Sequence, residues 1–321
     1  MTGFYVGAYA TAPVTQSWDP EVQTAYFNGL KALLGVRGLE HPFTGTLHGQ
    51  DDTWFLANVD PGWDFVFTGI PGVMGCLGED ASFGIASSAE AGRQAALAFY
   101  QQARQAILKL NRHLGRQAVQ VMMLHTAPRP AEGVRPDVAA LVASLEEMVS
   151  WDWDGAALVI EHCDTKVEGK VPSKGFLTIE SEIEAITAVN RKTGSQIGLC
   201  INWGRSALEA RSVDGPVRHI EAARAAGLLK GLMFSGVSGA EGPYGSWQDT
   251  HMPPAGEASS GAFEPCSMLN EVEFRRCLEA ADPQALDYMG IKIGVRPESL
   301  DTAGRLAYIE SALNMLQRAA G

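Results

Sequence analysis

The sequence predicts a single (β/α)8 barrel that occupies residues 1–321 as one domain. Three observations predict it: short apolar runs recur along the chain, helical patterns lie between them, and eight such runs can be counted. This alternation is typical of a parallel sheet covered by helices, and eight strands are the number that closes a barrel. The predicted strands are Phe4–Ala10, Gly35–Glu40, Phe65–Ile70, Val119–His125, Ala156–Glu161, Ile197–Asn202, Gly231–Ser235 and Met289–Val295.

Helix start signals support the same alternation. Asp19 is followed by Pro20, a capping residue with proline at the first helical position. The segment Ser88–Leu114 predicts a long helix, whereas Asp51–Val59 predicts at most a short one. Further helices are predicted to begin at Asp137, Ser181, Asp214, Asn270 and Ser299.

Two long segments follow strands three and seven and show little regular pattern. They run over residues 69–86 and 236–265, and the second is rich in glycine and proline. Loops that follow strands lie on the catalytic face of such a barrel, and long loops in a compact domain are often functional. We therefore predict that both segments act as lids.

Composition narrows the class of protein. The net charge of −12 and the lack of a basic run disfavour nucleic-acid binding. Five cysteines without a C-x-x-C pair disfavour a disulfide framework or a zinc ribbon. No stretch reaches the roughly 20 apolar residues of a membrane span, and no signal peptide is evident. We expect a cytoplasmic protein with a small-molecule substrate and no membrane partner, and self-association into a homo-oligomer stays open.

Polar side chains gather where the predicted strands end, which is where barrel chemistry occurs. Glu161 follows the apolar run Leu158–Ile160, and a buried carboxylate in such a place must be paired. Lys292 is the natural partner in a purely structural interpretation. Aromatic faces at the same end could stack on a sugar ring or pack beneath a lid. The polar and aromatic candidates are Glu40, His48, His125, Glu161, His162, Asn202, Trp203, Arg205, Trp247, His251, Lys292 and Arg296.

Three strand ends resemble those of the xylose-isomerase-like barrels, a superfamily of sugar isomerases, epimerases and related enzymes. They are Gly35–Glu40, Leu158–Glu161 and Gly198–Arg205. In that superfamily the fifth strand ends in a metal-binding glutamate, and the sixth commonly ends in D-x-x-H. The resemblance implies a sugar isomerase or epimerase that uses a divalent metal.

The sequence departs from this pattern at the metal ligands. Asn202 and Arg205 replace the D-x-x-H pair, while Ser235 and Lys292 stand near the ligand positions of strands seven and eight. A cation beside a metal ion is strongly repelled in a low-dielectric pocket. We therefore predict no metal and no other cofactor at the usual site. A different divalent site built from Asn202, His125, His162 or His251 stays open.

The resemblance and the substitutions together predict aldose–ketose isomerisation through an enediolate. Glu161 is expected to be the base, with its pKa raised by burial. Lys292 is expected to stabilise the enediolate in place of a metal, and His125 or His162 to shuttle hydroxyl protons. Arg205 and Arg296 suggest an anionic sugar, such as sulfoquinovose or a hexuronate. The remaining substrate-binding candidates are Glu40, His48, Asn202, Trp203, Trp247 and His251.

Three alternatives stay open. An epimerase would use the same enediolate. A glycoside hydrolase would use two carboxylates, for which Glu40 and Glu161 are the candidates. A sugar-binding barrel without catalysis is compatible with the altered ligand set.

Overall fold

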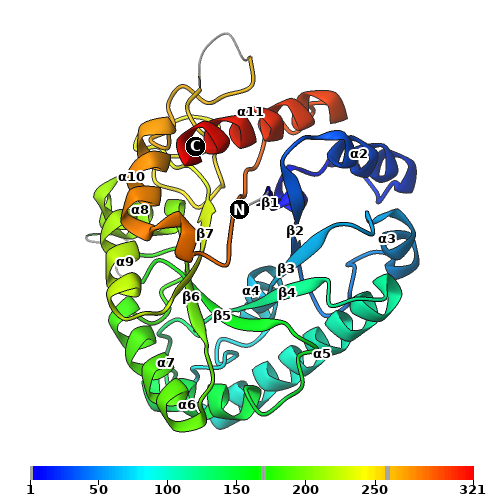
Figure 1. Cartoon of the computed structure of the whole chain (residues 1–321). Helices are drawn as coiled ribbons and strands as arrows, with labels where there is room; N and C mark the ends of the chain where they lie inside the picture. Colours follow the sequence, from blue (N-terminus) through cyan, green and yellow to red (C-terminus); the bar gives the residue numbers. More distant parts are fainter. Residues whose placement is uncertain (1–2, 166, 168, 170, 257–260) are drawn as a thin grey trace.

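The eight predicted strands close into one parallel barrel in the computed structural model, which describes residues 3–165, 167, 169, 171–256 and 261–321 (Figure 1). Each strand pairs with the next one in sequence, and the last pairs with the first. The predicted (β/α)8 barrel is therefore confirmed. The strands are β1 (Phe4–Val6), β2 (Val36–Pro42), β3 (Asp64–Thr68), β4 (Val119–Leu124), β5 (Ala157–His162), β6 (Gly198–Asn202), β7 (Leu229–Phe234) and β8 (Tyr288–Ile291).

Helices surround the strands as an outer layer, and α11 near the C-terminus packs against α2 to complete it (Figure 1). The helices are α1 (Ala8–Thr11), α2 (Pro20–Ala32), α3 (Asp52–Asn58), α4 (Ile70–Glu79), α5 (Glu90–Leu114), α6 (Val138–Met148), α7 (Ile179–Thr193), α8 (Trp203–Ala210), α9 (Asp214–Ala225), α10 (Glu271–Ala281), the 3-10 turn η2 (Pro283–Ala285) and α11 (Thr302–Ala320).

Several helices begin where the sequence predicts. The Asp19 carboxylate accepts hydrogen bonds from the first N–H groups of α2, and Asp137 and Asn270 cap α6 and α10 in the same way. Such caps satisfy donors that have no partner inside the helix. Asp214 is the first residue of α9, as expected.

Two predicted caps are wrong by less than one turn. Thr178, not Ser181, caps α7, since its hydroxyl accepts a hydrogen bond from the Ser181 N–H. Asp301, not Ser299, caps α11 through the Gly304 N–H. In both places the residue with extended backbone and a side-chain oxygen aimed at the helix takes the cap position.

The segment after β3 also corrects the prediction, because α4 occupies Ile70–Glu79 within the expected loop. Three glycines in this helix weaken its pattern in the sequence. Gly72 has a packing reason, since a Cβ there would lie 2.6 Å from the Phe43 carbonyl oxygen. The second long segment contains no helix between Gly236 and Glu264 within its described residues, as expected.

Residues 236–252 of this second segment are closed into a loop by backbone hydrogen bonds between its two ends. Gly236 and Met252 exchange two backbone hydrogen bonds, of 2.7 and 3.1 Å. The Tyr244 hydroxyl donates to the Gly294 carbonyl at 3.2 Å. These contacts hold the segment against the end of β8. Residues 257–260, which belong to the predicted lid, lie outside the described residues.

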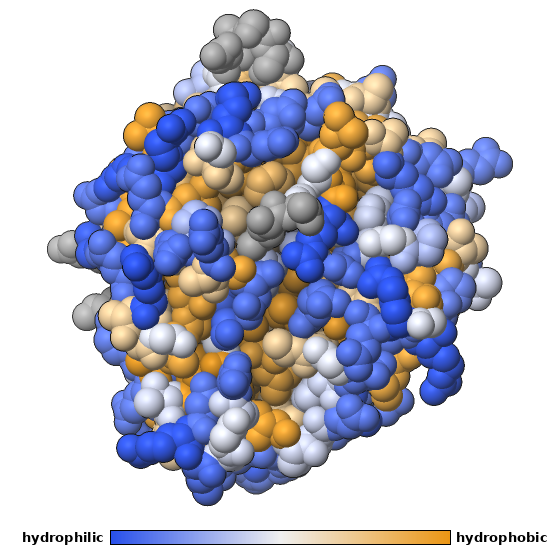
Figure 2. All heavy atoms as spheres, in the orientation of Figure 1, coloured by the Kyte–Doolittle hydropathy of each residue, from blue (hydrophilic) through white to orange (hydrophobic). Residues whose placement is uncertain are grey.

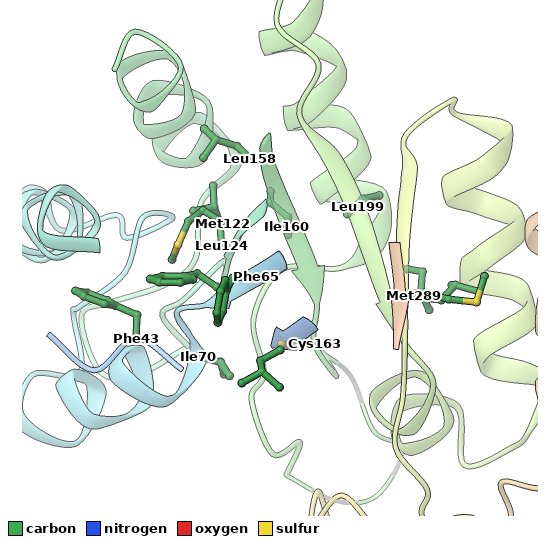
Figure 3. Packing of buried hydrophobic residues seen from close by; sticks show 14 of the residues in the cluster. Phe43, Phe65, Ile70, Met122, Leu124, Leu158, Ile160, Cys163, Leu199 and Met289 are labelled. Atoms are coloured by element: carbon green, nitrogen blue, oxygen red, sulfur yellow. The ribbon is translucent and has the colours of Figure 1, made fainter. Parts of the chain in front are cut away.

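The core has two layers. The outer layer lies between strands and helices, where Phe65, Met122 and Leu158 point away from the barrel axis (Figure 3). The inner layer fills the barrel itself. Its members alternate along the strands with those of the outer layer, as strand geometry requires. The inner residues are Tyr5, Val66, Val121, Met123, Val159, Cys200, Met233 and Tyr288.

The surface is mixed in hydropathy. Hydrophilic residues cover much of the face in Figure 2, with hydrophobic patches between them. The strongly exposed large hydrophobic side chains among the described residues come from four separate segments: Val14, Leu34, Val171 and Val272. Homo-oligomer formation stays a prediction. Within the described residues, the helices lack the combination of length and apolar character that a membrane span requires.

The tight β2–β3 contact generates a stability prediction. A Cβ at Gly38 would overlap the Asp64 backbone carbonyl of β3, so Gly38→Ala must push two strands apart. We expect a loss of about 1–3 kcal/mol or more in the free energy of unfolding, measured by urea denaturation. Gly75→Ala is the matched control, since nothing lies within 4 Å of a Cβ in that exposed helical position. It should stabilise slightly, by about 0.5–1 kcal/mol. Equal destabilisation by both changes would contradict the packing argument.

Candidate functional site

A ring of polar side chains lies one layer above the inner core, at the carboxyl ends of the strands. On strands that also contribute to the inner core, the ring member points to the same side of the sheet as the inner-core residue. Glu161, for example, comes two residues after Val159. We call this set the mouth ring. Its members are buried, with at most 1% of their surface exposed. The mouth ring consists of Glu40, Thr68, His125, Glu161, Asn202, Ser235 and Lys292.

Lys292 links two carboxylates of the ring. Its ammonium group lies 2.7 Å from Glu40 Oε1 and 3.7 Å from Glu161 Oε1. It also lies 5.8 Å from the centre of the Tyr9 ring. The pairing that the structural interpretation expected is therefore present, but its shorter contact is with Glu40.

Glu161 is held in its ionised form. Burial alone would raise the pKa of this carboxyl, but the Arg205 guanidinium and the Lys292 ammonium outweigh it and bring the pKa below its usual range. Arg205 Nη1 lies 3.5 Å from Glu161 Oε1, and the Asn202 amide donates a hydrogen bond of 3.1 Å to the same oxygen. The expectation of a raised pKa for Glu161 is therefore wrong. Burial does act to raise the pKa, but the two nearby cations outweigh this effect.

Glu40 has the opposite shift. Burial raises the pKa of its carboxyl, and the nearby Glu161 charge adds to this, while Lys292 opposes both. Its second oxygen, Oε2, accepts no hydrogen bond from the described residues, and neither does Glu161 Oε2. The mouth ring thus contains two buried carboxylates, each with one oxygen that has no hydrogen-bond partner among the described residues.

Asn202 explains the geometry that follows β6. Its side-chain oxygen accepts hydrogen bonds from the Gly204 N–H at 3.1 Å and the Ser235 hydroxyl at 2.9 Å. It thereby caps α8, which begins directly at Trp203. Arg205 falls in the first turn of this helix and is carried into the site, with 1% of its surface exposed.

These contacts bear on the divalent metal that the xylose-isomerase-like fold implies. The Asn202 oxygen is engaged at the helix, and its amide, not its oxygen, is turned to Glu161. Arg205 and Lys292 lie within 3.7 Å of the Glu161 carboxylate, where a cation would be repelled. The mouth ring does not fit the usual metal.

His125 lies in the ring as a neutral imidazole. Burial lowers its pKa to about 3. Its Nε2 is 3.4 Å from the Thr68 hydroxyl and 3.9 Å from Glu161 Oε2. A neutral imidazole there can donate or accept a hydrogen bond with a ligand hydroxyl.

His162 is not part of the ring, which corrects the proposed proton shuttle. It follows Glu161 in β5 and therefore points to the opposite side of the sheet, toward the helices. There its Nδ1 lies 2.8 Å from Glu182 and its Nε2 lies 3.2 Å from Glu209. No described contact joins it to the mouth ring.

Asp249 also lies in the candidate site, although it is not among the candidates predicted from the sequence. It lies in the segment after β7, and its carboxylate is 3.0 Å from Lys174 Nζ and 3.8 Å from Arg205 Nε. His251 Nδ1 is 3.4 Å from the same carboxylate. Trp247 and His251 both have positive φ, 52° and 55°, so the segment turns sharply on each side of Asp249. That irregular path has no periodic signal in the sequence.

The other substrate-binding candidates are spread around the mouth. Trp203 is 1% exposed and packs in the outer core, so it is not placed to touch a ligand. Trp247 packs against Arg211, with the guanidinium 5.1 Å from the indole centre. Arg296 lies on the rim, 3.4 Å from Glu298. His48 stacks on Phe55 with ring centres 5.4 Å apart.

A cavity of about 370 Å³ adjoins the ring above β1 and β2. Glu40, His48, Tyr9 and Trp18 contribute to its wall. This volume suits a small ligand. The cavity brings two predicted residues, Glu40 and His48, together with the aromatic rings of Tyr9 and Trp18.

Comparison with known proteins identifies the family. Residues 5–308 match the model of a domain of unknown function, DUF4862, so the chain belongs to that family. It is 36% identical over 322 residues to an uncharacterized protein of Salmonella typhimurium strain LT2, covering 99% of this chain and 98% of the relative.

Solved structures with the same fold have low sequence identity. A putative xylose isomerase from Rhodospirillum rubrum aligns with a TM-score of 0.63 at 11% identity, covering 100% of both chains. A D-psicose 3-epimerase from Clostridium cellulolyticum aligns with a TM-score of 0.54 at 15% identity, covering 100% of this chain and 96% of that one. The xylose-isomerase-like barrel that the strand ends resemble is thus confirmed as the fold.

The ionised state of Glu161 makes its contribution to stability depend on pH. Its lowered pKa contributes stability that is complete above the unfolded-state pKa of about 4.3 and is lost progressively as pH falls from there through the folded-state pKa of about 2. Glu161→Gln should therefore lower the free energy of unfolding by about 3–5 kcal/mol at pH 7, and by less at pH 3.5. Urea denaturation at the two pH values measures this. The control is Glu146→Gln, which removes an exposed pair with Lys192 and should change stability by less than about 1 kcal/mol. A loss independent of pH would contradict the charge assignment.

Proposed function

We propose that this protein is an aldose–ketose isomerase that works through an enediolate at the mouth ring. The observation that supports this most strongly is the pair of buried carboxylates, Glu40 and Glu161, on either side of the Lys292 ammonium. Each carboxylate has an oxygen without a protein partner among the described residues. This arrangement combines a base with a fixed positive charge, which enediolate chemistry requires.

Glu40, and not Glu161, is the base in this proposal. Its raised pKa lies closer to the range that suits proton transfer near neutral pH, and it borders the cavity. Glu40 takes a proton from the carbon next to the sugar carbonyl, and the carbonyl oxygen gains the negative charge. The Lys292 ammonium stabilises that charge. The C2 hydroxyl proton then moves to the oxygen on C1, carried by the neutral His125 imidazole. Glu40 returns its proton to C1, so C2 becomes the ketose carbonyl and the isomerisation is complete.

Glu161 serves as a fixed charge that keeps Arg205 and Lys292 in place. An epimerase needs a second proton donor on the opposite face of the sugar, and an ionised carboxylate held by two cations is a poor donor. The same contacts disfavour a glycoside hydrolase, because Lys292 occupies the space between the two carboxylates. Isomerisation needs one base only.

The charges at the mouth favour a neutral sugar over the anionic sugar that the strand-end cations predict. Lys292 contacts Glu40, Arg205 contacts Glu161, and Lys174 contacts Asp249. Each of these three cations therefore faces a carboxylate. Arg296 on the rim is the remaining candidate for an acidic group, and Glu298 lies beside it.

The test is a screen of neutral and acidic aldoses in D2O, followed by NMR. We expect deuterium at C2 and growth of the ketose with a neutral aldose. Glu40→Gln should lower kcat by about 10²–10⁴-fold with little change in KM, because glutamine keeps the shape but cannot take a proton. Glu146→Gln on the surface should leave both constants unchanged.

Each other result points to a different class of protein. Full activity in Glu40→Gln removes Glu40 as the base. Inversion at one carbon without ketose indicates an epimerase, and release of an aglycone from a glycoside indicates a hydrolase. Saturable binding without exchange indicates a sugar-binding barrel. Thermal stabilisation by acidic sugars alone contradicts the neutral substrate.

A further inference from the structure

A second cluster of titratable side chains lies outside the barrel, on the helix side of β5. His162 of β5, Glu209 of α8 and His219 of α9 each offer one ligand atom, and these atoms all lie within 4.8 Å of one another. Glu182 of α7 is the fourth member of the cluster and contacts the Nδ1 of His162. The proposed enzyme mechanism uses none of these four residues.

His162 has the orientation of a metal-binding histidine. Its Nδ1 is bonded to Glu182 Oε2 at 2.8 Å, and its Nε2 faces Glu209 Oε2 at 3.2 Å. The other Glu182 oxygen accepts a hydrogen bond of 2.8 Å from the Thr126 hydroxyl. Metal-binding histidines commonly donate their second nitrogen to a carboxylate in this way, which fixes the ring and makes the ligand nitrogen more basic.

His219 is oriented in a similar manner. Its Nδ1 lies 2.9 Å from the buried Ser206 hydroxyl, which leaves Nε2 as the nitrogen available to a metal. The two imidazole rings have centres 4.8 Å apart and planes at 88°. Glu209 Oε2 is itself positioned by the Thr165 N–H at 3.0 Å. Each of the three ligand residues therefore has its own hydrogen-bonded support.

We propose that His162, Glu209 and His219 bind a divalent cation of the zinc type. Two ligands at about 2.0–2.1 Å from a tetrahedral zinc ion are about 3.3 Å apart, close to the 3.2 Å between His162 and Glu209. Two histidines and one carboxylate are a common zinc ligand set with a fourth position for water. Glu209 and His219 are partly exposed, so that position can reach solvent.

The charges around this cluster differ from those in the mouth ring. Glu182 and Glu209 supply two negative charges, which a divalent cation neutralises, and the cation replaces the proton that His162 shares with them. Arg205 and Lys292 instead contact Glu161, which points to the opposite side of β5 from His162. The site would link α8 and α9 to β5. Because Arg205 lies in α8, the bound ion would also stabilise the position of that residue.

Metal analysis of the full-length protein, purified without a metal-affinity step, tests the proposal. After dialysis against a chelator, we expect one equivalent of added Zn²⁺ to bind and to raise the melting temperature. His219→Gln and Glu209→Gln should each weaken Zn²⁺ binding by at least 100-fold, measured by competition with a chromophoric chelator. The control is His113→Gln, an exposed histidine at the end of α5, which should leave affinity unchanged.

Two further measurements keep the test decisive. Ser206→Ala retains all three ligands and should weaken binding by about 10–100-fold, even where a ligand variant fails to fold. X-ray absorption should show nitrogen and oxygen neighbours at about 2.0–2.1 Å. Zn²⁺ that is lost in Glu161→Gln but kept in His219→Gln would place the ion in the mouth ring and overturn the proposal. Absence of stoichiometric binding would also overturn it and leave the cluster as a set of ion pairs.

Discussion

The ammonium group of Lys292 lies between two buried carboxylates, and the rest of the mouth ring is arranged around that contact. A buried carboxylate without a partner is costly, and two next to each other are more so. The contact also accounts for the glycine at position 7, directly after β1. A Cβ at Gly7 would lie 2.9 Å from the Lys292 side chain and 3.0 Å from Glu40 Oε2, so only glycine leaves room for the pair.

The fold was predictable from sequence because eight apolar runs and their helix signals repeat in a simple order. The strand ends were predictable in the same way, and most of the mouth ring was identified from them. The sequence did not indicate to which side of the sheet each side chain points. Leu158, Val159 and Ile160 are all apolar, because a parallel strand is buried on both faces. The run therefore carries no sign that Glu161 points inward and His162 outward.

Contacts between distant segments were also out of reach. Asp249 enters the site from a segment without regular structure, and Thr178 or Asp301 could be chosen as caps only with backbone angles known. The pKa of Glu161 shows the same limit in energetic terms. Burial was foreseeable from the apolar run, but the positions of Arg205 and Lys292, which decide the sign of the shift, depend on tertiary structure.

Asn202 connects the charge pattern of the site to the architecture of the barrel. Its amide serves Glu161 while its oxygen serves the start of α8. An aspartate at position 202 could cap the helix but would repel the Glu161 carboxylate as a like charge. A metal ion could relieve that repulsion, but Arg205 and Lys292 would repel the ion. Changing this site toward the ligand pattern of the metal-dependent barrels thus requires several substitutions together. Each single step is unfavourable, so the substitutions are strongly epistatic, and an ion-paired mouth of this kind is separated from a metal centre by a mutational barrier.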